Sequence, residues 1–139
     1  MWRAGGLIYL PGPTTGKRPS QMRAETQANI EKIRKSLTLL GQRMDIETAS
    51  HRLEEFNARV EDPTLWDDPA RAQKLMRDRQ ALVDRIGTHD AIRAGLEDNV
   101  GLIELGEMEG DAEVVAEAEA ALAELVEMAA KKELEALLD

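Results

Sequence analysis

The chain has 139 residues, of which 42% are hydrophobic, 32% are charged and only 3% are aromatic, and its formal net charge is −9. This length fits one domain, and no apolar run reaches the roughly 18 residues of a membrane span. The sequence has no cysteine, which excludes disulfides, thiolate metal sites and cysteine nucleophiles.

The negative charge is concentrated at one end of the chain. Residues 1–21 hold three basic residues and no acid, and residues 22–96 hold 13 residues of each sign. Residues 97–139 hold 14 acidic residues and two lysines, which gives this segment a charge of −12. A phosphate backbone repels such a segment, so binding nucleic acid is not predicted as the main task of the chain.

The first 21 residues differ in composition from the rest, because they hold four of the ten glycines and three of the five prolines. Their apolar run, residues 7–10, has four residues, too short for the core of a secretory signal, which has about 7–15. An acid-free start with arginine also suits an organelle transit segment, but this one has no helical period. We predict a flexible, disordered N-terminal extension, with Met22 as a genuine or alternative start.

From Met22 onward the sequence indicates helices, since Ala, Glu, Lys, Leu and Arg make up 65 of the 118 residues and apolar residues recur with helical spacing. The first helix is predicted over residues 23–40, ending at a left-handed cap on Gly41. Its apolar stripe consists of Ile30, Ile33, Leu37 and Leu40.

A second helix is predicted over residues 45–60, with Asp45 as its N-terminal cap. It ends before Pro63, which disfavours helical geometry at Asp62. Its apolar positions follow the spacing 3,4,3,4 and are Ile46, Ala49, Leu53, Phe56 and Val60.

The third helix has the clearest start, because Asp68 is a good cap and Pro69 suits the first helical position. We expect it to reach Leu105, although Gly95 and Gly101 each weaken it by roughly 1 kcal/mol relative to alanine. Its stripe consists of Ala72, Leu75, Met76, Leu82, Val83, Ile86, His89, Leu96, Val100 and Ile103.

A turn is predicted over residues 106–110, and Asp111 is expected to cap a fourth helix that continues to the C-terminus. The stripe of this helix consists of Val115, Ala118, Leu122, Leu125 and Ala129, and Leu134, Leu137 and Leu138 extend the apolar content to the C-terminus. No segment alternates with period two. The predicted fold is all-α, a long antiparallel hairpin or bundle of about four helices over residues 22–139.

The sequence contains few candidates for a chemical site. His89 has no second His, Cys or Ser placed to act with it, so we interpret it as a partly buried histidine of the stripe. His51 and Glu47 could face one metal ion, but two ligands are too few for a site. Asp67 and Asp68 could form an acid–base pair, yet their place before Pro69 is explained by helix capping.

The remaining candidates are weaker. Gly101, Gly106 and Gly110 fit no phosphate-binding or dinucleotide-binding pattern. The acidic run from Glu97 onward lacks the spacing of a calcium loop. Trp66 is either an exposed anchor for a partner or a plug over the helix junction, and we favour the plug. We therefore predict no catalytic, cofactor-binding or metal-binding residue in this chain.

Residues 52–75 contain the pattern Asp62-Pro63, Trp66, Asp68-Pro69 and Ala72-Gln73. This pattern resembles the N-terminal helical domain of the bacterial peptide chain release factor 2 family. The resemblance extends over about residues 22–139 and is supported by residues 95–98 and by Leu105 before the acidic turn.

The resemblance implies a role in translation termination in the cytoplasm. Whole factors of this family use Gly-Gly-Gln for hydrolysis of peptidyl-tRNA and Ser-Pro-Phe for reading stop codons. Neither tripeptide occurs among these 139 residues, where the nearest approach is Gly41-Gln42. The resemblance places Asp139 near the end of the family's first domain. It therefore implies a docking module without catalytic or codon-reading residues.

The partner implied by the resemblance is the stalk base of the large ribosomal subunit, together with the other domains of a full-length factor. Because the last segment is strongly acidic, we expect basic ribosomal proteins to be its contacts, and neither a membrane nor a small-molecule substrate. Phosphate contact is more plausible through residues 22–96, where five arginines lie outside or beside the stripes: Arg52, Arg59, Arg71, Arg77 and Arg79.

A stand-alone helical-hairpin or coiled-coil adaptor for protein–protein contacts is the alternative. It would need no downstream domains and would self-associate through exposed stripe residues. The gene sequence after Asp139 distinguishes the two, since an open frame encoding Gly-Gly-Gln would favour the release factor.

Overall fold

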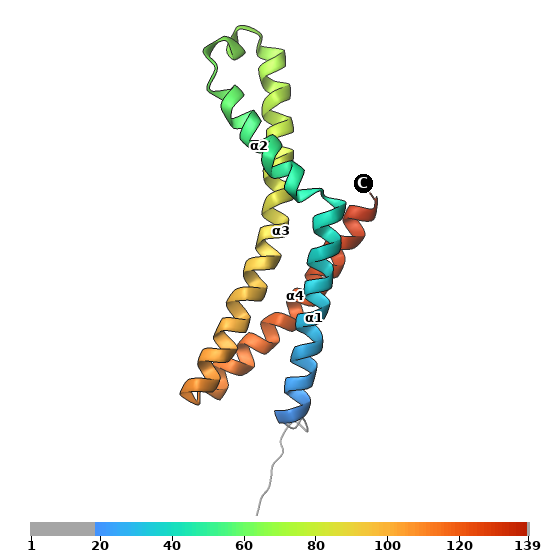
Figure 1. Ribbon diagram of the computed structural model, residues 1–139, viewed down its shortest axis with the longest axis vertical. Helices are drawn as coiled ribbons and strands as arrows, with labels where there is room; N and C mark the ends of the chain where they lie inside the picture. The colour runs from blue at the N-terminus through green and yellow to red at the C-terminus, as the bar shows by residue number, and fades with distance from the viewer. Residues whose placement is uncertain (1–18, 139) are drawn as a thin grey trace, which may run out of the picture.

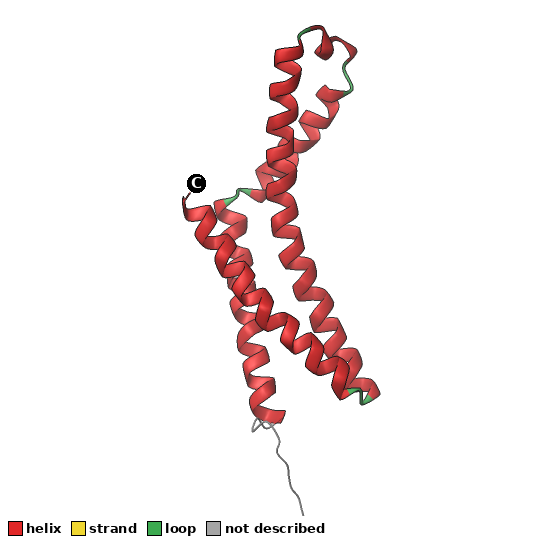
Figure 2. Cartoon of the chain, turned by 180° about the vertical axis from the view of Figure 1, so that it is seen from behind, coloured by secondary structure: helices red, strands yellow, loops and turns green. Residues whose placement is uncertain are grey.

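The computed structural model describes residues 19–138, with side chains from residue 23 onward. This part of the chain is almost entirely helical, with short turns between helices and no strand (Figure 1, Figure 2). The all-α prediction is therefore confirmed. The elements are α1 (Pro19–Arg43), α2 (Ile46–Val60), the 3-10 helix η2 (Pro63–Asp67), α3 (Pro69–Glu109) and α4 (Ala112–Leu138).

The extension predicted over residues 1–21 falls mostly outside the described residues. Its last three residues do not, because α1 begins at Pro19. The helix thus starts four residues before the predicted residue 23. The division of the chain at Met22 remains a prediction.

The molecule is elongated because α3 is long. With 41 residues, α3 extends for about 60 Å at 1.5 Å per residue. Its C-terminal half packs against α1 and α4, and its N-terminal half packs against α2 and η2 (Figure 1). The result is a three-helix body with a two-helix arm at one end.

Each part has its own apolar core. The body core joins α1, α3 and α4 and contains Ile30, Ile33, Leu40, Ile92, Leu96, Leu122, Leu125 and Ala129. The arm core joins α2, η2 and α3 and contains Ala49, Phe56, Leu65, Ala72, Leu75 and Leu82. These residues lie on the predicted apolar stripes, except for Ile92 and for Leu65 in η2, which the predicted stripes omitted.

The end of α1 differs from the prediction. Gly41 is helical, and the helix continues to Arg43. Gly41 instead gives room to His89, whose Nε2 would lie 3.4 Å from a Cβ at this position. The left-handed residue is Asp45, with φ of 51° and no side-chain capping bond. Aspartate tolerates this conformation better than most residues, so Asp45 makes the turn without acting as the predicted cap.

The junction of α3 and α4 also lies later than predicted. Gly106 is helical and buried, and the left-handed residue is Gly110, with φ of 69°. The N–H of Asp111 donates to the Gly106 carbonyl at 2.8 Å, and the N–H of Gly110 donates to the Glu107 carbonyl at 3.4 Å. This pair of bonds is the Schellman arrangement that ends many helices.

Two predicted caps are confirmed. The Asp68 carboxylate accepts a hydrogen bond from the Arg71 N–H at 3.3 Å, and that of Asp111 accepts one from the Val114 N–H at 3.2 Å. Each bond satisfies an amide that would otherwise lack a partner in the first helical turn. Within residues 19–138, no helix combines the length and apolar character needed to cross a membrane.

Candidate interaction surfaces

The histidines offer no site for chemistry. His89 is half-buried in the helix packing, as interpreted from the sequence, and its Nε2 lies 3.3 Å from the Leu37 carbonyl oxygen. His51 and Glu47 are both exposed on α2. In the described part of the chain, no group of three or more His, Asp or Glu side chains could hold a metal ion.

The aspartates around η2 serve the backbone. The Asp62 carboxylate accepts hydrogen bonds from the N–H of Thr64 at 2.9 Å and from its hydroxyl at 2.8 Å. These two bonds, the backbone one first, lower the pKa of Asp62 below 3.8. Asp68 caps α3, and Asp67 is exposed beside it. The geometry gives these carboxylates turn-forming and capping roles in place of an acid–base pair.

Trp66 is not the plug that we favoured from the sequence. Its side chain is 54% exposed, whereas that of Leu65 is 8% exposed and belongs to the arm core. The reason is the 3-10 geometry of η2, with about three residues per turn, which turns neighbouring side chains in different directions. Leu65 closes the helix junction, and Trp66 is left facing outward at the tip of the arm.

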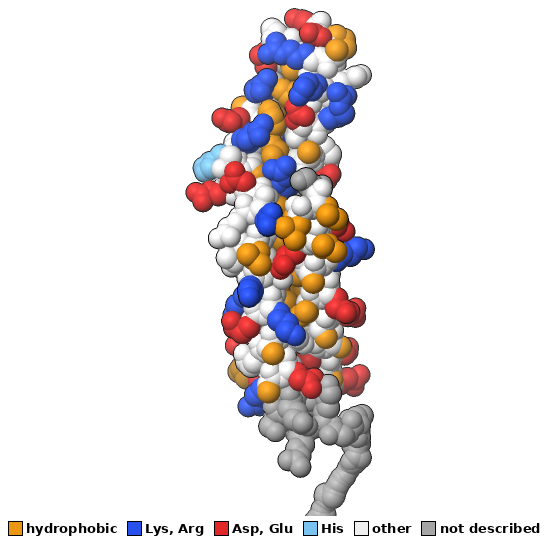
Figure 3. Space-filling model, turned by 90° about the vertical axis from the view of Figure 1, so that its right-hand side faces the viewer, with side chains coloured by type: hydrophobic (Ala, Val, Ile, Leu, Met, Phe, Trp, Pro, Cys, Tyr) orange, Lys and Arg blue, Asp and Glu red, His pale blue; other side chains and the backbone are white. Residues whose placement is uncertain are grey.

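The five arginines singled out in the sequence do not form an uninterrupted basic patch. Arg52 and Arg59 both lie over the Phe56 ring, 5.6 Å from its centroid, and Arg79 Nε donates to Asn57 Oδ1 at 2.6 Å. Residues 46–86, which form the arm, hold seven basic and nine acidic residues. Lys and Arg side chains alternate with Asp and Glu at the arm end of Figure 3. This mixture provides little attraction for a phosphate backbone.

A groove of about 680 Å³ lies between α1, α3 and α4 near the α3–α4 turn. Across it the Thr26 hydroxyl donates to Glu119 Oε2 at 2.6 Å. At its rim Arg23 and Glu107 form an ion pair at 3.3 Å. These contacts tie α1 to α3 and α4. The packing of these three helices explains the groove, and the residues that line it form no catalytic arrangement.

Two exposed apolar groups lie on the body. One is on α4 near its end, where hydrophobic side chains gather at about mid-height on the face in Figure 3, and includes Leu134, Leu137 and Leu138. The other is on the last turns of α3 and consists of Leu102, Leu105 and Met108. The α3 group was not predicted from the sequence, although the spacing of three residues between its members is a readable signal.

One short charge network lies on α3 before this group. Arg93 lies 3.0 Å from Glu97 and 3.6 Å from Asp90. The hydrogen bond to Glu97, followed by the charges of both carboxylates, raises the pKa of Arg93 above its usual value. The arginine is therefore already engaged by acids of its own helix.

Comparison with known proteins places the chain in a family. The PCRF domain model matches residues 49–139. The chain is 70% identical to peptide chain release factor 2 of Roseobacter denitrificans over 118 residues, which are 85% of this chain and 32% of the relative. The corresponding protein of a Ruegeria species is 69% identical over 118 residues, again 85% and 32% of the two chains.

The similarity extends beyond these two organisms. Peptide chain release factor 2 of Paramagnetospirillum magneticum is 47% identical over 117 residues, which are 84% of this chain and 32% of the relative. The chain thus spans about a third of the length of the curated relatives it matches. Since the PCRF model covers well over half of the residues, the chain belongs to the PCRF domain family.

Proposed function

We propose that residues 22–139 form the helical first domain of a peptide chain release factor, which docks that factor on the ribosome during translation termination in the cytoplasm. The observation that carries the proposal is the 70% identity to a release factor 2 over 85% of this chain. The stalk base of the large subunit is the proposed docking site, as the family resemblance implies.

The chemistry of the described residues supports a binding role. The pattern Gly-Gly-Gln does not occur in the sequence, and the aspartates that stand out have capping or turn-forming roles. We propose that this part of a factor contributes attachment and no hydrolysis. Catalysis and codon reading belong to other domains in this account.

The charge distribution indicates what kind of ribosomal component is contacted. Residues 97–139 carry a charge of −12, so rRNA repels the α4 side of the body. Basic ribosomal proteins offer the complementary sign. Their attraction weakens with salt, because surface charges are screened over about 8 Å at physiological ionic strength.

Binding and release assays test this proposal together. The labelled chain is titrated with stalk-base protein, with the bare stalk-base RNA and with the two combined. We expect weak, salt-sensitive binding that requires the protein. The same chain, added to ribosomes stalled at a stop codon, is expected to release no peptide. Tight binding to bare RNA, or peptide release by this chain alone, would contradict the proposal.

A further inference from the structure

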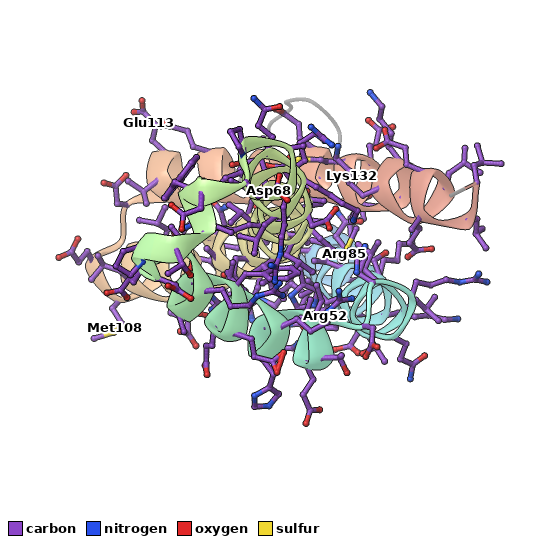
Figure 4. All side chains as sticks on the ribbon, turned by 90° about the horizontal axis from the view of Figure 1, so that it is seen from above. Arg52, Asp68, Arg85, Met108, Glu113 and Lys132 are labelled. Carbon is purple, nitrogen blue, oxygen red and sulfur yellow. The ribbon has the colours of Figure 1, made fainter. Side chains whose placement is uncertain are left out.

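The last turns of α3 present an apolar edge that no other element of residues 19–138 covers. Leu102, Leu105 and Met108 are 44%, 48% and 84% exposed. Met108 points away from the other helices in Figure 4. At 100° per residue, Leu105 lies opposite the buried Leu96 on α3, and Met108 lies about 120° from it. A contiguous exposed apolar group of this kind marks an interaction surface.

The apolar edge is the end of a longer seam along the outside of α3. We name as the outer seam a set of residues separated alternately by four and three positions, which is the spacing of a coiled-coil contact. Its residues are small in the middle of α3 and large near its end. The outer seam consists of Gly87, Ala91, Ala94, Asp98, Gly101, Leu105 and Met108.

Two glycines of the outer seam have no packing explanation within residues 19–138. A Cβ at Gly87 or Gly101 would meet nothing within 4 Å, whereas a Cβ at Gly95 would lie 3.1 Å from Leu125. Glycine in a helix interior costs about 1 kcal/mol relative to alanine. Close packing against Leu125 explains why a glycine is present at Gly95 despite this cost, but no such contact explains Gly101. The bare backbone of the outer seam leaves space for a second helix to approach closely.

The charge of residues 87–109 indicates which kind of helix can bind to the outer seam. Residues 87–109 contain six carboxylates and one arginine, and this arginine already pairs with Glu97. Asp98 lies within the outer seam, and Glu109, the residue after Met108, is exposed at its end. A second copy of the chain would bring like charges together, and RNA would add more negative charge. Lysines and arginines on a protein helix complement this surface.

We propose that the outer seam binds a basic amphipathic helix of a protein partner. Its apolar residues contact Leu105 and Met108, and its lysines or arginines face Asp98 and Glu109. This inference rests on the docking function proposed above. It adds the face that docks and the chemistry of the partner.

The steric test uses the full 139-residue chain and bacterial large ribosomal subunits as the probe. Gly101→Leu places a bulky side chain in the outer seam, and Ala120→Leu places the same side chain on the exposed surface of α4. Gly101→Leu is expected to melt at an equal or higher temperature, since leucine favours helix over glycine. Its Kd is expected to rise roughly tenfold or more, as for loss of a central contact. Ala120→Leu should change the Kd by less than about twofold.

The charge test compares two variants with the same net charge. Asp98→Lys reverses a charge in the outer seam, and Glu127→Lys reverses one on the exposed surface of α4. We expect Asp98→Lys to weaken binding to the large subunit much more than Glu127→Lys. Equal effects, or tighter binding by Asp98→Lys, would contradict a basic partner at the outer seam.

The remaining outcomes separate the two proposals. If the unchanged chain binds and Gly101→Leu binds equally well, the outer seam is the wrong face and the docking function stands. If the unchanged chain does not bind at all, the docking function fails and this inference fails with it. If the chain dimerises in solution and Gly101→Leu makes it monomeric, the occupant is a second copy and the basic-helix proposal is wrong.

Discussion

Gly106 on α3 lies directly against Val115 on α4. A Cβ built on Gly106 would stand 2.8 Å from Val115 Cγ2 and 3.2 Å from the carbonyl oxygen of Asp111. Gly101, five residues earlier on α3, would meet nothing within 4 Å. The two glycines therefore have different roles: Gly106 permits the close approach of two helices, and Gly101 lies on the open outer side.

This contrast predicts opposite effects of the same substitution. Gly101→Ala is expected to raise the free energy of unfolding by about 1 kcal/mol, the difference in helix propensity. Gly106→Ala is expected to lower it, because overpacking typically costs about 1–3 kcal/mol and outweighs the gain in propensity. Urea unfolding followed by circular dichroism measures both. Stabilisation by Gly106→Ala would show that the α3–α4 contact is looser than described.

The body core predicts a large cost for removing a buried leucine. Leu122 is completely buried between the helices, whereas Leu137 on the same helix is 52% exposed. Leu122→Ala is expected to lower the free energy of unfolding by about 2–5 kcal/mol. Leu137→Ala serves as the matched control and should have a much smaller effect. A cost below about 1 kcal/mol for Leu122→Ala would contradict the assigned helix face.

The start of α3 depends on one capping carboxylate. Asp68→Ala removes the acceptor for the Arg71 N–H and is expected to cost about 0.5–2 kcal/mol of folding free energy. The neighbouring Asp67→Ala provides the control, as Asp67 is exposed and does not cap α3. Thermal melts of the two variants measure the difference. Equal melting temperatures would show that the cap contributes nothing.

The η2 turn is expected to loosen in acid. Because Thr64 donates hydrogen bonds to the ionised carboxylate, the pKa of Asp62 lies below 3.8 in the folded chain. A lowered pKa means that the stabilisation is present above the unfolded pKa and is lost as the pH falls through the folded value. An NMR titration of the Thr64 amide should therefore show its change below pH 3.8. Asp62→Ala should abolish that change, and a midpoint at or above 3.8 would contradict this account.

Local signals explain why much of the fold was predictable. Asp68-Pro69 and Asp111 are caps whose hydrogen bonds involve residues only three positions away. The α2 stripe is short enough for a 3,4 repeat to stay on one face. These caps and this stripe depend only on residues that are close in the sequence. The structure has them at the predicted positions.

The wrong predictions involve contacts between segments that are far apart in the sequence. Gly41 carries the composition of a helix end, but it packs against His89 and stays helical. Gly106 likewise reflects the approach of α4 and not a turn. Ile92 was omitted although it lies three residues after His89 and four before Leu96, which is the spacing of one helix face. The exposure of Trp66 could not be predicted without knowing that residues 63–67 form a 3-10 helix.

The candidate surfaces were harder to predict than the fold. The outer seam of α3 follows the same spacing as the buried stripe, and the sequence alone does not tell which of two faces is covered. Burial of Leu96 and exposure of Met108 resolve this. The absence of Gly-Gly-Gln from these residues was readable directly.

A domain exchange tests the central claim most directly. Residues 22–139 of this chain replace the matching 118-residue segment in peptide chain release factor 2 of Roseobacter denitrificans. The account predicts that the chimera releases peptide at stop codons with activity close to that of the unchanged factor, and that Gly101→Leu in the chimera reduces release more than Ala120→Leu. A correctly folded chimera that does not release peptide would contradict the claim that these residues serve as a release-factor domain.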